Sequence, residues 1–398
     1  MIKNLRVLYI SYDGMTDSLG QSQVIPYLLG GSERNIEYHL ISFDKPEQYR
    51  KNKSRVEQLL KGRKIYWYSL VYHKFPPIIS TILDLREGWK LIKDLHRDYN
   101  FNIVHCRGYI TAILGLRLKE KYDVKFIFDM RGWWPDEKLE SGLWASPIFK
   151  PVYNYFKKME HNFFSKADKI ISLTHKGKER IVNKYGIEEN RVGVIPTCVD
   201  FKIFKEYKLE IRNEVREELN LPLNEDVIIY SGSIGANYPP LDILSFYKRL
   251  SAKTGAYLLI LTKEDPTLIT DELNKVSLDS SKIRFASCEY EDVYRYLIAS
   301  DIGIILYRIA FSTIGRSPTK LGEYWACGVT VISISGIGDL NTIKDKYQGV
   351  GLELLDDVNS SESVDVQFVD KEILRKNAID YFDINKGIDF YCSVYRSL

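Results

Sequence analysis

Short apolar runs rich in β-branched residues alternate along the chain with amphipathic segments of helix length. In the first half, the runs predict strands at residues 5–11, 36–43, 64–72, 102–106, 125–129, 169–174 and 191–195. Their nearly continuous apolar character is typical of parallel strands that helices cover on both faces. Between them, residues 78–99 repeat apolar side chains at helical spacing. The pattern predicts a doubly wound α/β domain over residues 1–200.

The same alternation restarts after a charged segment. Residues 201–225 hold a short solvent-facing helix pattern and are interpreted as a linker region. Further strands are then predicted at residues 227–231, 256–262, 282–285, 301–307 and 330–334. They predict a second Rossmann-like domain over residues 226–380, followed by a C-terminal helix, 381–398, that packs back on the N-terminal domain. Two such domains facing each other would place a central cleft at the carboxyl ends of both sheets.

Composition excludes several classes of protein. The 398 residues are 45% hydrophobic, which is too apolar for a disordered chain. No apolar run approaches the roughly 18 residues that a membrane span needs, and the apolar start of the chain is interpreted as a strand. The five cysteines are odd in number and far apart, without zinc-ligand spacing. These features favour a reducing cytoplasm and exclude a disulfide framework.

Charge is distributed unevenly between the two halves. Residues 1–200 carry a balance of +10 and the remainder a balance of −7. The asymmetry either reflects different surface compositions or indicates an anionic partner, nucleic acid or a membrane surface. Residues 61–75 and 149–166 combine basic and aromatic residues, as at a lipid headgroup region. For the second segment, the buried stripe of a helix is the favoured interpretation, and for the first segment both stay open. Nucleic acid is disfavoured because acidic residues alternate with the basic ones.

Residues 311–328 hold the most informative cluster of polar side chains. Ser317, followed by a proline, predicts the cap of a helix that starts there. Lys320 then falls in the first turn and Glu323 one turn later, with Arg316 just before the helix. Free amides, a hydroxyl and cations at a helix start suit phosphates, and the carboxylate suits a ribose diol. The alternative is a capped surface helix with a Lys–Glu pair.

Five segments, in order, resemble landmarks of one enzyme family. They are YDGMTDSLGQSQVIPY (12–27), FDMRGWWPDE (128–137), ISLTHKGKERI (171–181), VIPTCVDFKIF (194–204) and SPTKLGE (317–323). The chain is thereby similar to the retaining glycosyltransferases of family 4, in particular to a bacterial and archaeal polysaccharide subgroup. The resemblance implies the GT-B fold, with the nucleotide-sugar donor on the C-terminal domain and the acceptor on the N-terminal domain.

The resemblance also implies roles for individual residues. Glu323 would hold the ribose hydroxyls, and Arg131, after the fifth strand, would lie nearest the reacting centre. With Lys320, these two form the predicted catalytic set. The residues implied to contact the donor are Gly20, Gly232, Ser233, Arg316, Ser317, Thr319, Lys320 and Glu323.

Three positions depart from the family pattern. Gly315 stands where the family usually has the first of two glutamates, which meets the donor sugar. Ser233 and Tyr238 stand where the family commonly has an arginine and a lysine. Arg316 is a candidate replacement for one lost charge. The chain contains no Asp-x-Asp, so we expect neither a metal nor any cofactor besides a UDP- or GDP-linked sugar as substrate.

Candidate acceptor residues lie in the N-terminal half. His105 and Arg107 end a predicted strand, and Asp13 lies in a turn. Trp133 and Trp134 are adjacent in a loop, where they suit stacking on a sugar or a prenyl chain. Each also has a structural interpretation: a core histidine, a turn-forming aspartate, and tryptophans that anchor the loop.

The sequence as a whole predicts a metal-independent hexosyltransferase that builds surface polysaccharide. Its acceptor would be a glycan or a lipid-linked molecule, met in the cytoplasm or at the inner membrane face. Two alternatives stay open: a catalytically inert homologue that binds nucleotide or glycan as a partner subunit, and a nucleotide-sugar 2-epimerase. The scarcity of histidines in the candidate loops disfavours epimerase chemistry, and the absence of G-x-G-x-x-G after the first strand disfavours a dehydrogenase.

Overall fold

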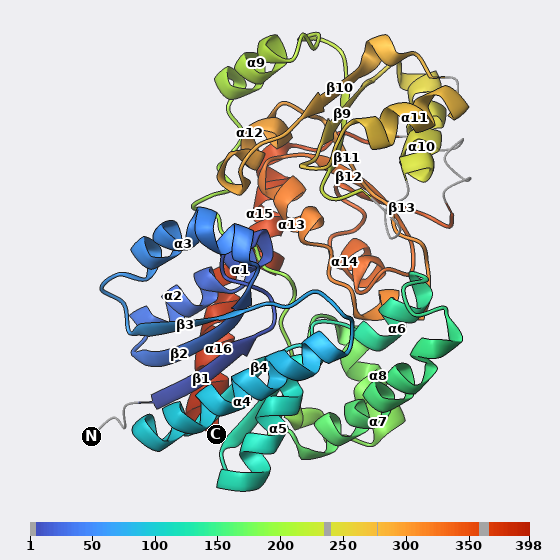
Figure 1. The fold of residues 1–398 in the computed structure, drawn as a ribbon. Helices are drawn as coiled ribbons and strands as arrows, with labels where there is room; N and C mark the ends of the chain where they lie inside the picture. The colour runs from blue at the N-terminus through green and yellow to red at the C-terminus, as the bar shows by residue number, and fades with distance from the viewer. Residues whose placement is uncertain (1–4, 235–239, 277, 358–365) are drawn as a thin grey trace. The chain divides into compact units, whose positions relative to one another are not determined.

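The chain folds into two compact α/β units. The computed structural model describes residues 5–234, 240–276, 278–357 and 366–398 (Figure 1). One unit comprises Met1–Pro196 together with Ile384–Leu398, and the other comprises Thr197–Asp383. Each unit is a parallel sheet covered by helices, as the alternation of apolar runs and amphipathic segments predicts.

The first unit contains a seven-stranded parallel sheet in the order β3-β2-β1-β4-β5-β6-β7. Its strands are β1 (Leu5–Ser11), β2 (Ile36–Asp44), β3 (Ile65–Val71), β4 (Ile103–Arg107), β5 (Lys125–Asp129), β6 (Lys169–Ser172) and β7 (Val192–Val194). The register places Ser11 of β1 opposite Ser42 of β2 and Arg107 of β4. Polar side chains therefore gather at the carboxyl edge of the sheet. Between β1 and β4 the strand order also changes direction, and ligands of such sheets bind at this switch point.

Helices cover both faces of this sheet. They are α1 (Ser18–Gln23), α2 (Ile25–Glu33), α3 (Pro46–Leu60), α4 (Ile79–Tyr99), α5 (Tyr109–Tyr122), α6 (Trp134–Glu140), α7 (Lys150–Lys166), α8 (His175–Tyr185) and α16 (Ile384–Ser397), with short 3-10 turns η1 (Pro147–Phe149) and η2 (Glu189–Arg191). The last helix, α16, packs on α2 (Figure 1). Its apolar face, which includes Ile388 and Tyr395, is buried. The final 14-residue helix thus completes the N-terminal sheet's covering layer.

The second unit contains a six-stranded parallel sheet in the order β10-β9-β8-β11-β12-β13. Its strands are β8 (Val227–Ser231), β9 (Tyr257–Leu261), β10 (Ile283–Ala286), β11 (Ile302–Ile305), β12 (Thr330–Ile334) and β13 (Leu352–Leu355). Its helices are α9 (Leu209–Glu218), α10 (Pro240–Thr254), α11 (Thr267–Val276), α12 (Val293–Ile298), α13 (Thr319–Ala326), α14 (Leu340–Lys346) and α15 (Lys371–Phe382), with the 3-10 turns η3 (Ser280–Lys282), η4 (Tyr290–Asp292) and η5 (Phe311–Gly315). One buried apolar core joins the sheet to these helices.

The unit boundaries differ from the predicted ones. The first unit ends at Pro196, and residues 201–225 belong to the second unit rather than forming a separate linker. Helix α9 packs on α12, and its Val215 and Arg216 are fully buried although most of the segment's side chains are charged. The predicted helix over 381–398 is instead two helices: α15 of the second unit ends at Phe382, and α16 of the first unit begins at Ile384. Within the described residues, no helix has the length and apolarity needed to cross a bilayer.

Candidate functional site

Helix α13 of the second unit carries the predicted phosphate site. The helix begins at Thr319, and its N-cap residue is Pro318, which provides no capping side chain. The prediction that Ser317 caps the helix is therefore wrong. The hydroxyl of Ser317 instead accepts a hydrogen bond from the amide of Thr197 at 3.1 Å, and the Thr197 hydroxyl donates to the Ser317 carbonyl at 2.9 Å. Ser317 thus ties the start of the helix to the start of the unit.

Lys320 is a partly buried cation in the first turn of α13. Its Nζ lies over the ring of Tyr230, 4.4 Å from the ring centroid. Burial lowers the pKa of Lys320 to about 8, although the charge of Glu323 acts in the opposite direction. A partly buried ammonium is less well solvated than an exposed one, so an anion placed beside it would gain a charge-assisted hydrogen bond.

Gly232 brings the backbone close to this ammonium. A Cβ built at Gly232 would lie 2.6 Å from Nζ of Lys320, and the residue's φ of +131° is a conformation that L side chains rarely adopt. The φ favours glycine at this turn, and a Cβ there would displace the flexible end of Lys320. Its amide donates to the carbonyl of Leu261 on the neighbouring strand at 2.9 Å, which fixes the turn at the carboxyl end of β8. The structure thus brings together Gly232 and Lys320, as predicted from the sequence.

Glu323 lies one turn after Lys320 on the same helix and is also buried. Burial raises the pKa of Glu323 to about 7, while the hydroxyl of Tyr290 and the charge of Lys320 both favour the ionised form. Tyr290, in η4 after β10, donates to Oε1 of Glu323 at 3.2 Å. Sequence reasoning missed Tyr290, because only the sheet order β10-β9-β8-β11 brings η4 beside α13.

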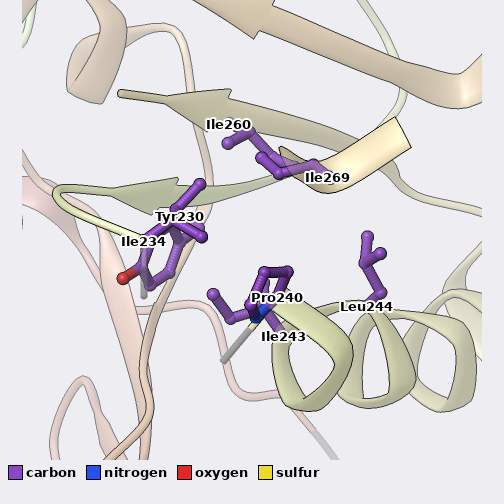
Figure 2. Close-up of a pocket in the computed structure, with 7 residues that line it drawn as sticks. All are labelled: Tyr230, Ile234, Pro240, Ile243, Leu244, Ile260 and Ile269. Carbon is purple, nitrogen blue, oxygen red and sulfur yellow. The ribbon is translucent and has the colours of Figure 1, made fainter. Parts of the chain in front are cut away.

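Tyr230 supports Lys320 from the side of the sheet. Its hydroxyl donates to the carbonyl of Ser233 at 2.6 Å. Beside the ring is a small apolar pocket, whose lining residues are Tyr230, Ile234, Pro240, Ile243, Leu244, Ile260 and Ile269 (Figure 2). Its walls are too close together to admit a ligand. Figure 2 shows Pro240, Ile243 and Leu244 on α10, across from Ile260 and Ile269. The ring of Tyr230 under Lys320 is therefore fixed in place by packed aliphatic side chains.

The remaining predicted donor residues surround the start of α13. The guanidinium of Arg316 stacks over Tyr307, 5.1 Å from its ring centroid. Thr319 is half-buried in the first turn, and Ser233 is exposed after the Gly232 turn. Gly315, at the family's first glutamate position, ends the buried turn η5. Tyr238, the second position that departs from the family pattern, lies outside the described residues.

The second unit therefore brings together groups that can bind phosphate and a diol. The first-turn amides of α13, the ammonium of Lys320 and the Gly232 backbone can hold phosphate oxygens. The carboxylate of Glu323 can accept hydrogen bonds from a vicinal diol. Phosphates and a diol on one molecule describe a nucleotide.

In the first unit, a charged cluster lies at the carboxyl ends of β4 and β5. Asp129 is fully buried, and Oδ1 lies 3.9 Å from Nη1 of Arg131. Burial alone would raise the pKa of Asp129, but the charges of Arg131 and Arg107 and a hydrogen bond from His105 hold it below its usual range. Arg131 adopts a φ of +56°, a strained conformation that functional residues often show.

His105 is placed differently from the acceptor-binding role predicted for it. Its ring is fully buried, with Nδ1 2.6 Å from the hydroxyl of Tyr395 and Nε2 3.4 Å from Oδ2 of Asp129. Burial lowers the pKa of His105, so the ring is neutral near pH 7. Tyr391 also donates to Asp129, at 3.0 Å. His105 thus serves to join α16 to the sheet and is not accessible to an acceptor.

Asp13 and Arg107 form an ion pair at the same edge of the sheet. Nε of Arg107 lies 3.4 Å from Oδ2 of Asp13, which is part-exposed. The two adjacent tryptophans lie in different surroundings. Trp133 is fully buried among the rings of Phe164 and Tyr185, so its predicted stacking on an acceptor is wrong. Trp134 borders a large cavity that Asp13 also lines.

The loop after β1 is held by a carboxylate that sequence reasoning missed. Asp44, at the end of β2, is buried and accepts hydrogen bonds from the amide and hydroxyl of Thr16, at 2.9 and 2.8 Å, and from the hydroxyls of Ser42 and Ser69. Gly20 packs directly on this loop, because a Cβ there would lie 2.2 Å from the carbonyl oxygen of Gly14. Close packing alone explains a glycine at position 20. No sequence motif marks Asp44.

The described part of the chain contains no group of three His, Cys, Asp or Glu side chains placed to ligate a metal ion.

Part of the chain matches a known protein family. Residues 22–202 match the model of Glycosyltransferase Family 4. A D-inositol 3-phosphate glycosyltransferase of Xylanimonas cellulosilytica is 21% identical over 282 residues, which cover 69% of this chain and 60% of that protein. The chain thus spans about 60% of the length of this curated relative.

Two solved structures share the fold over nearly their whole lengths. Sucrose-phosphate synthase from Thermosynechococcus elongatus has a TM-score of 0.72 at 13% identity, covering 99% of this chain and 98% of that one. HepE from Anabaena, in complex with UDP and glucose, has a TM-score of 0.68 at 11% identity, covering 99% and 100%. The two Rossmann-like units together form a GT-B fold. The family model thus covers most of the first unit, and the solved structures share the fold of the whole chain.

Proposed function

We propose that this protein transfers a sugar from a UDP- or GDP-linked donor to an acceptor hydroxyl, with retention of configuration. One observation carries the proposal: a single helix start combines a partly buried ammonium, a glycine turn that approaches it and a buried carboxylate, on Lys320, Gly232 and Glu323. The structure of the similar HepE in complex with UDP and glucose supports a nucleotide-linked donor.

The donor would lie on the second unit. The diphosphate would be held by Lys320, the first-turn amides of α13 and the turn at Gly232 and Ser233, and the ribose hydroxyls by Glu323. Arg316, positioned by Tyr307, would supply a second cation. The donor sugar would meet backbone groups around Gly315, since this chain has no glutamate there. Gly20 and Arg131 would approach the donor from the first unit.

The chemical step develops negative charge on the departing nucleoside diphosphate. Lys320 and the amides of α13 are already oriented, so they stabilise that charge without reorganising. Removal of one such preorganised donor typically raises the barrier by about 2.7–4 kcal/mol. Lys320 must be protonated for this role, and with a pKa of about 8 it is mostly charged at neutral pH. Because the chain itself supplies the cations, we propose a reaction independent of metal.

The acceptor would be a glycan or a lipid-linked molecule used in surface polysaccharide, held by the first unit. Asp13 and Trp134 are the candidate residues that line a cavity, and the buried Arg107 pairs with Asp13. The basic excess of residues 1–200 supports work at an anionic membrane surface.

Slow transfer of the sugar to water tests this activity without knowledge of the acceptor. Purified protein would be incubated with UDP- and GDP-linked hexoses, with release of nucleoside diphosphate followed by chromatography and the anomer of the freed sugar by NMR. We expect one nucleotide series to turn over with the anomeric configuration retained, and Lys320→Met to lower the rate at least a hundredfold. Inversion at the anomeric carbon would contradict the proposed retention, and binding without turnover would favour the inert homologue.

A further inference from the structure

The first unit contains a large cavity between its helices and the carboxyl ends of β1, β2 and β3. Its volume is about 850 Å³, within the roughly 300–1,000 Å³ typical of ligand sites. The walls come from the ends of the strands, from α4 and α5, and from the segment that runs from α6 into α7. The cavity lies entirely within this unit.

The walls are mainly aliphatic and aromatic. Ile82 and Leu85 of α4 and Ile110 and Ile113 of α5 supply the aliphatic part. The aromatic part is a chain of contacting rings, in which Trp134 lies 5.1 Å from Trp144 and 4.9 Å from Phe156, between ring centroids. A surface of this kind binds hydrocarbon by burial of apolar area and offers few hydrogen bonds to a sugar.

Polar atoms next to these walls are bonded to one another. The hydroxyl of Tyr12 donates to Oδ2 of Asp84 at 2.7 Å, and Nδ1 of His73 lies 2.6 Å from Oδ1 of the same carboxylate. Asp84 is fully buried and lies outside the lining. The Tyr12 ring therefore contributes to the wall while its one polar side-chain atom is bound to Asp84.

The charges among the lining residues are net positive. Asp17 is paired with Lys45 at 2.9 Å, and Asp13 with Arg107 at 3.4 Å. Lys74 and Lys138 also line the cavity. Nζ of Lys138 lies 5.8 Å from the ring centroid of Trp134, so a cation stands directly beside an apolar wall. An amphiphile with an anionic head and a hydrocarbon tail complements this arrangement.

Exposed apolar side chains continue the lining outward. Ile78, Ile82, Leu143 and Tyr155 line the cavity and are between 42% and 60% exposed. Exposed apolar groups that surround a cavity mark a binding surface more often than isolated ones do. They come from the two chain segments that form opposite walls, so the hydrophobic surface extends from the interior to the outside.

We infer that this cavity holds the hydrocarbon chain of a phosphorylated lipid, whose phosphate meets Lys74 and Lys138. The inference rests on the proposed function, because it makes this lipid the acceptor. Asp13 lines the cavity and pairs with Arg107 at the carboxyl edge of the sheet. A lipid with its tail inside thus presents its head at the edge where acceptors are expected.

Binding of alkyl phosphates tests the cavity independently of catalysis. Dodecyl phosphate carrying a terminal bromine would be titrated into the full-length protein below its micelle concentration, with tryptophan fluorescence as readout. We expect quenching through Trp134 and Trp144, and about half of it or more to be lost in the Trp134→Phe, Trp144→Phe double variant. From decyl to dodecyl phosphate, we expect affinity to rise about tenfold or more, since burial of each methylene contributes roughly fourfold. Dodecanol and inorganic phosphate should each bind more weakly than the combined probe.

Two substitutions and a matched control locate the site. Ile113→Glu places a carboxylate on the α5 wall, and Ile82→Glu places one at the exposed edge, where folding tolerates it. Leu83→Glu is the control, because Leu83 is 46% exposed on the same helix but does not line the cavity. We expect both lining variants to weaken dodecyl phosphate at least tenfold and the control to change it less than twofold. Equal weakening by Leu83→Glu, or affinity independent of chain length, would overturn the inference.

Nucleotide titration of the same proteins separates this inference from the proposed function. Ile113→Glu and Ile82→Glu lie in the first unit, so binding of UDP or GDP to the second unit should be unchanged. Alkyl phosphate binding by a protein that binds no nucleotide would support the cavity and contradict the transferase. Nucleotide binding without alkyl phosphate binding would overturn the cavity alone.

Discussion

The lowered pKa of Lys320 predicts that nucleotide affinity falls at alkaline pH. Burial brings the pKa of this ammonium to about 8 in the free protein. A bound diphosphate favours the charged form, so binding is coupled to protonation of Lys320. Above pH 8 the free protein is mostly neutral at this position, and binding must include the uptake of a proton.

The magnitude follows from the pKa. Each unit of pH above 8 should weaken the affinity for UDP or GDP about tenfold, or roughly 1.4 kcal/mol. At pH 9.5 the dissociation constant should therefore be roughly thirtyfold larger than its best value. On the acid side, Glu323 with a pKa of about 7 gains a proton as pH falls and becomes a poorer acceptor for ribose hydroxyls. The affinity optimum should lie between pH 7 and 8.

Isothermal titration calorimetry between pH 6 and 9.5 measures this profile. Lys320→Arg is the matched control, because a guanidinium stays charged throughout this range and should remove the alkaline loss. Lys320→Met should weaken binding throughout the neutral range and also show no alkaline loss. A wild-type affinity that stays constant from pH 8 to 9.5 would refute the assignment of Lys320 to the phosphates.

Three further substitutions test the surroundings of the two proposed sites. Gly232→Ala should lower the stability of the second unit by about 1–3 kcal/mol, because alanine is strained at a φ of +131°, and should weaken nucleotide binding by displacing Lys320; thermal denaturation and calorimetry measure both. Tyr290→Phe removes a hydrogen bond that favours ionised Glu323, so the acid limb of the affinity profile should move to higher pH; an unmoved limb would contradict this. Asp44→Ala should lower the free energy of unfolding of the first unit by about 2–3 kcal/mol in urea, because the buried carboxylate holds the Thr16 loop through charge-assisted hydrogen bonds; a loss below about 0.5 kcal/mol would contradict that role.

Much of the fold could be predicted from local sequence pattern. Strands at residues 5–11, 125–129, 227–231 and 330–334 form with the predicted bounds, because each is a nearly continuous apolar run whose central residues are buried. The strand Leu352–Leu355 was missed. It contains a glutamate and lies at the edge of its sheet, where the pattern is weaker.

The arrangement of the proposed donor site could be predicted in part. The spacing of Lys320 and Glu323 on one helix follows from helix geometry, so a local pattern sufficed. Ser317 was assigned wrongly as a cap because its hydroxyl bonds to Thr197, which lies 120 residues earlier in the chain. Tyr290 and Tyr230 reach the helix through the order of strands in the sheet, which no single segment encodes.

The surroundings of the candidate acceptor residues were harder to predict, because the direction in which a loop side chain points depends on packing against residues far away in the sequence. His105 is enclosed by Tyr395, which is 290 residues away in sequence, and Trp133 is enclosed by α7 and α8. Its neighbour Trp134 instead lines the large cavity. Adjacent tryptophans in a sequence thus do not show which of them is accessible.

The central claim is that the second unit binds a nucleoside diphosphate through residues of this chain alone. Calorimetric titration of UDP and of GDP into the purified protein at pH 7.5, with and without EDTA, tests it most directly. The account predicts micromolar binding of one of the two, unchanged by EDTA, and a loss of at least tenfold in Glu323→Ala. Binding of neither nucleotide to the folded protein would contradict it, as would an affinity that Glu323→Ala leaves unchanged.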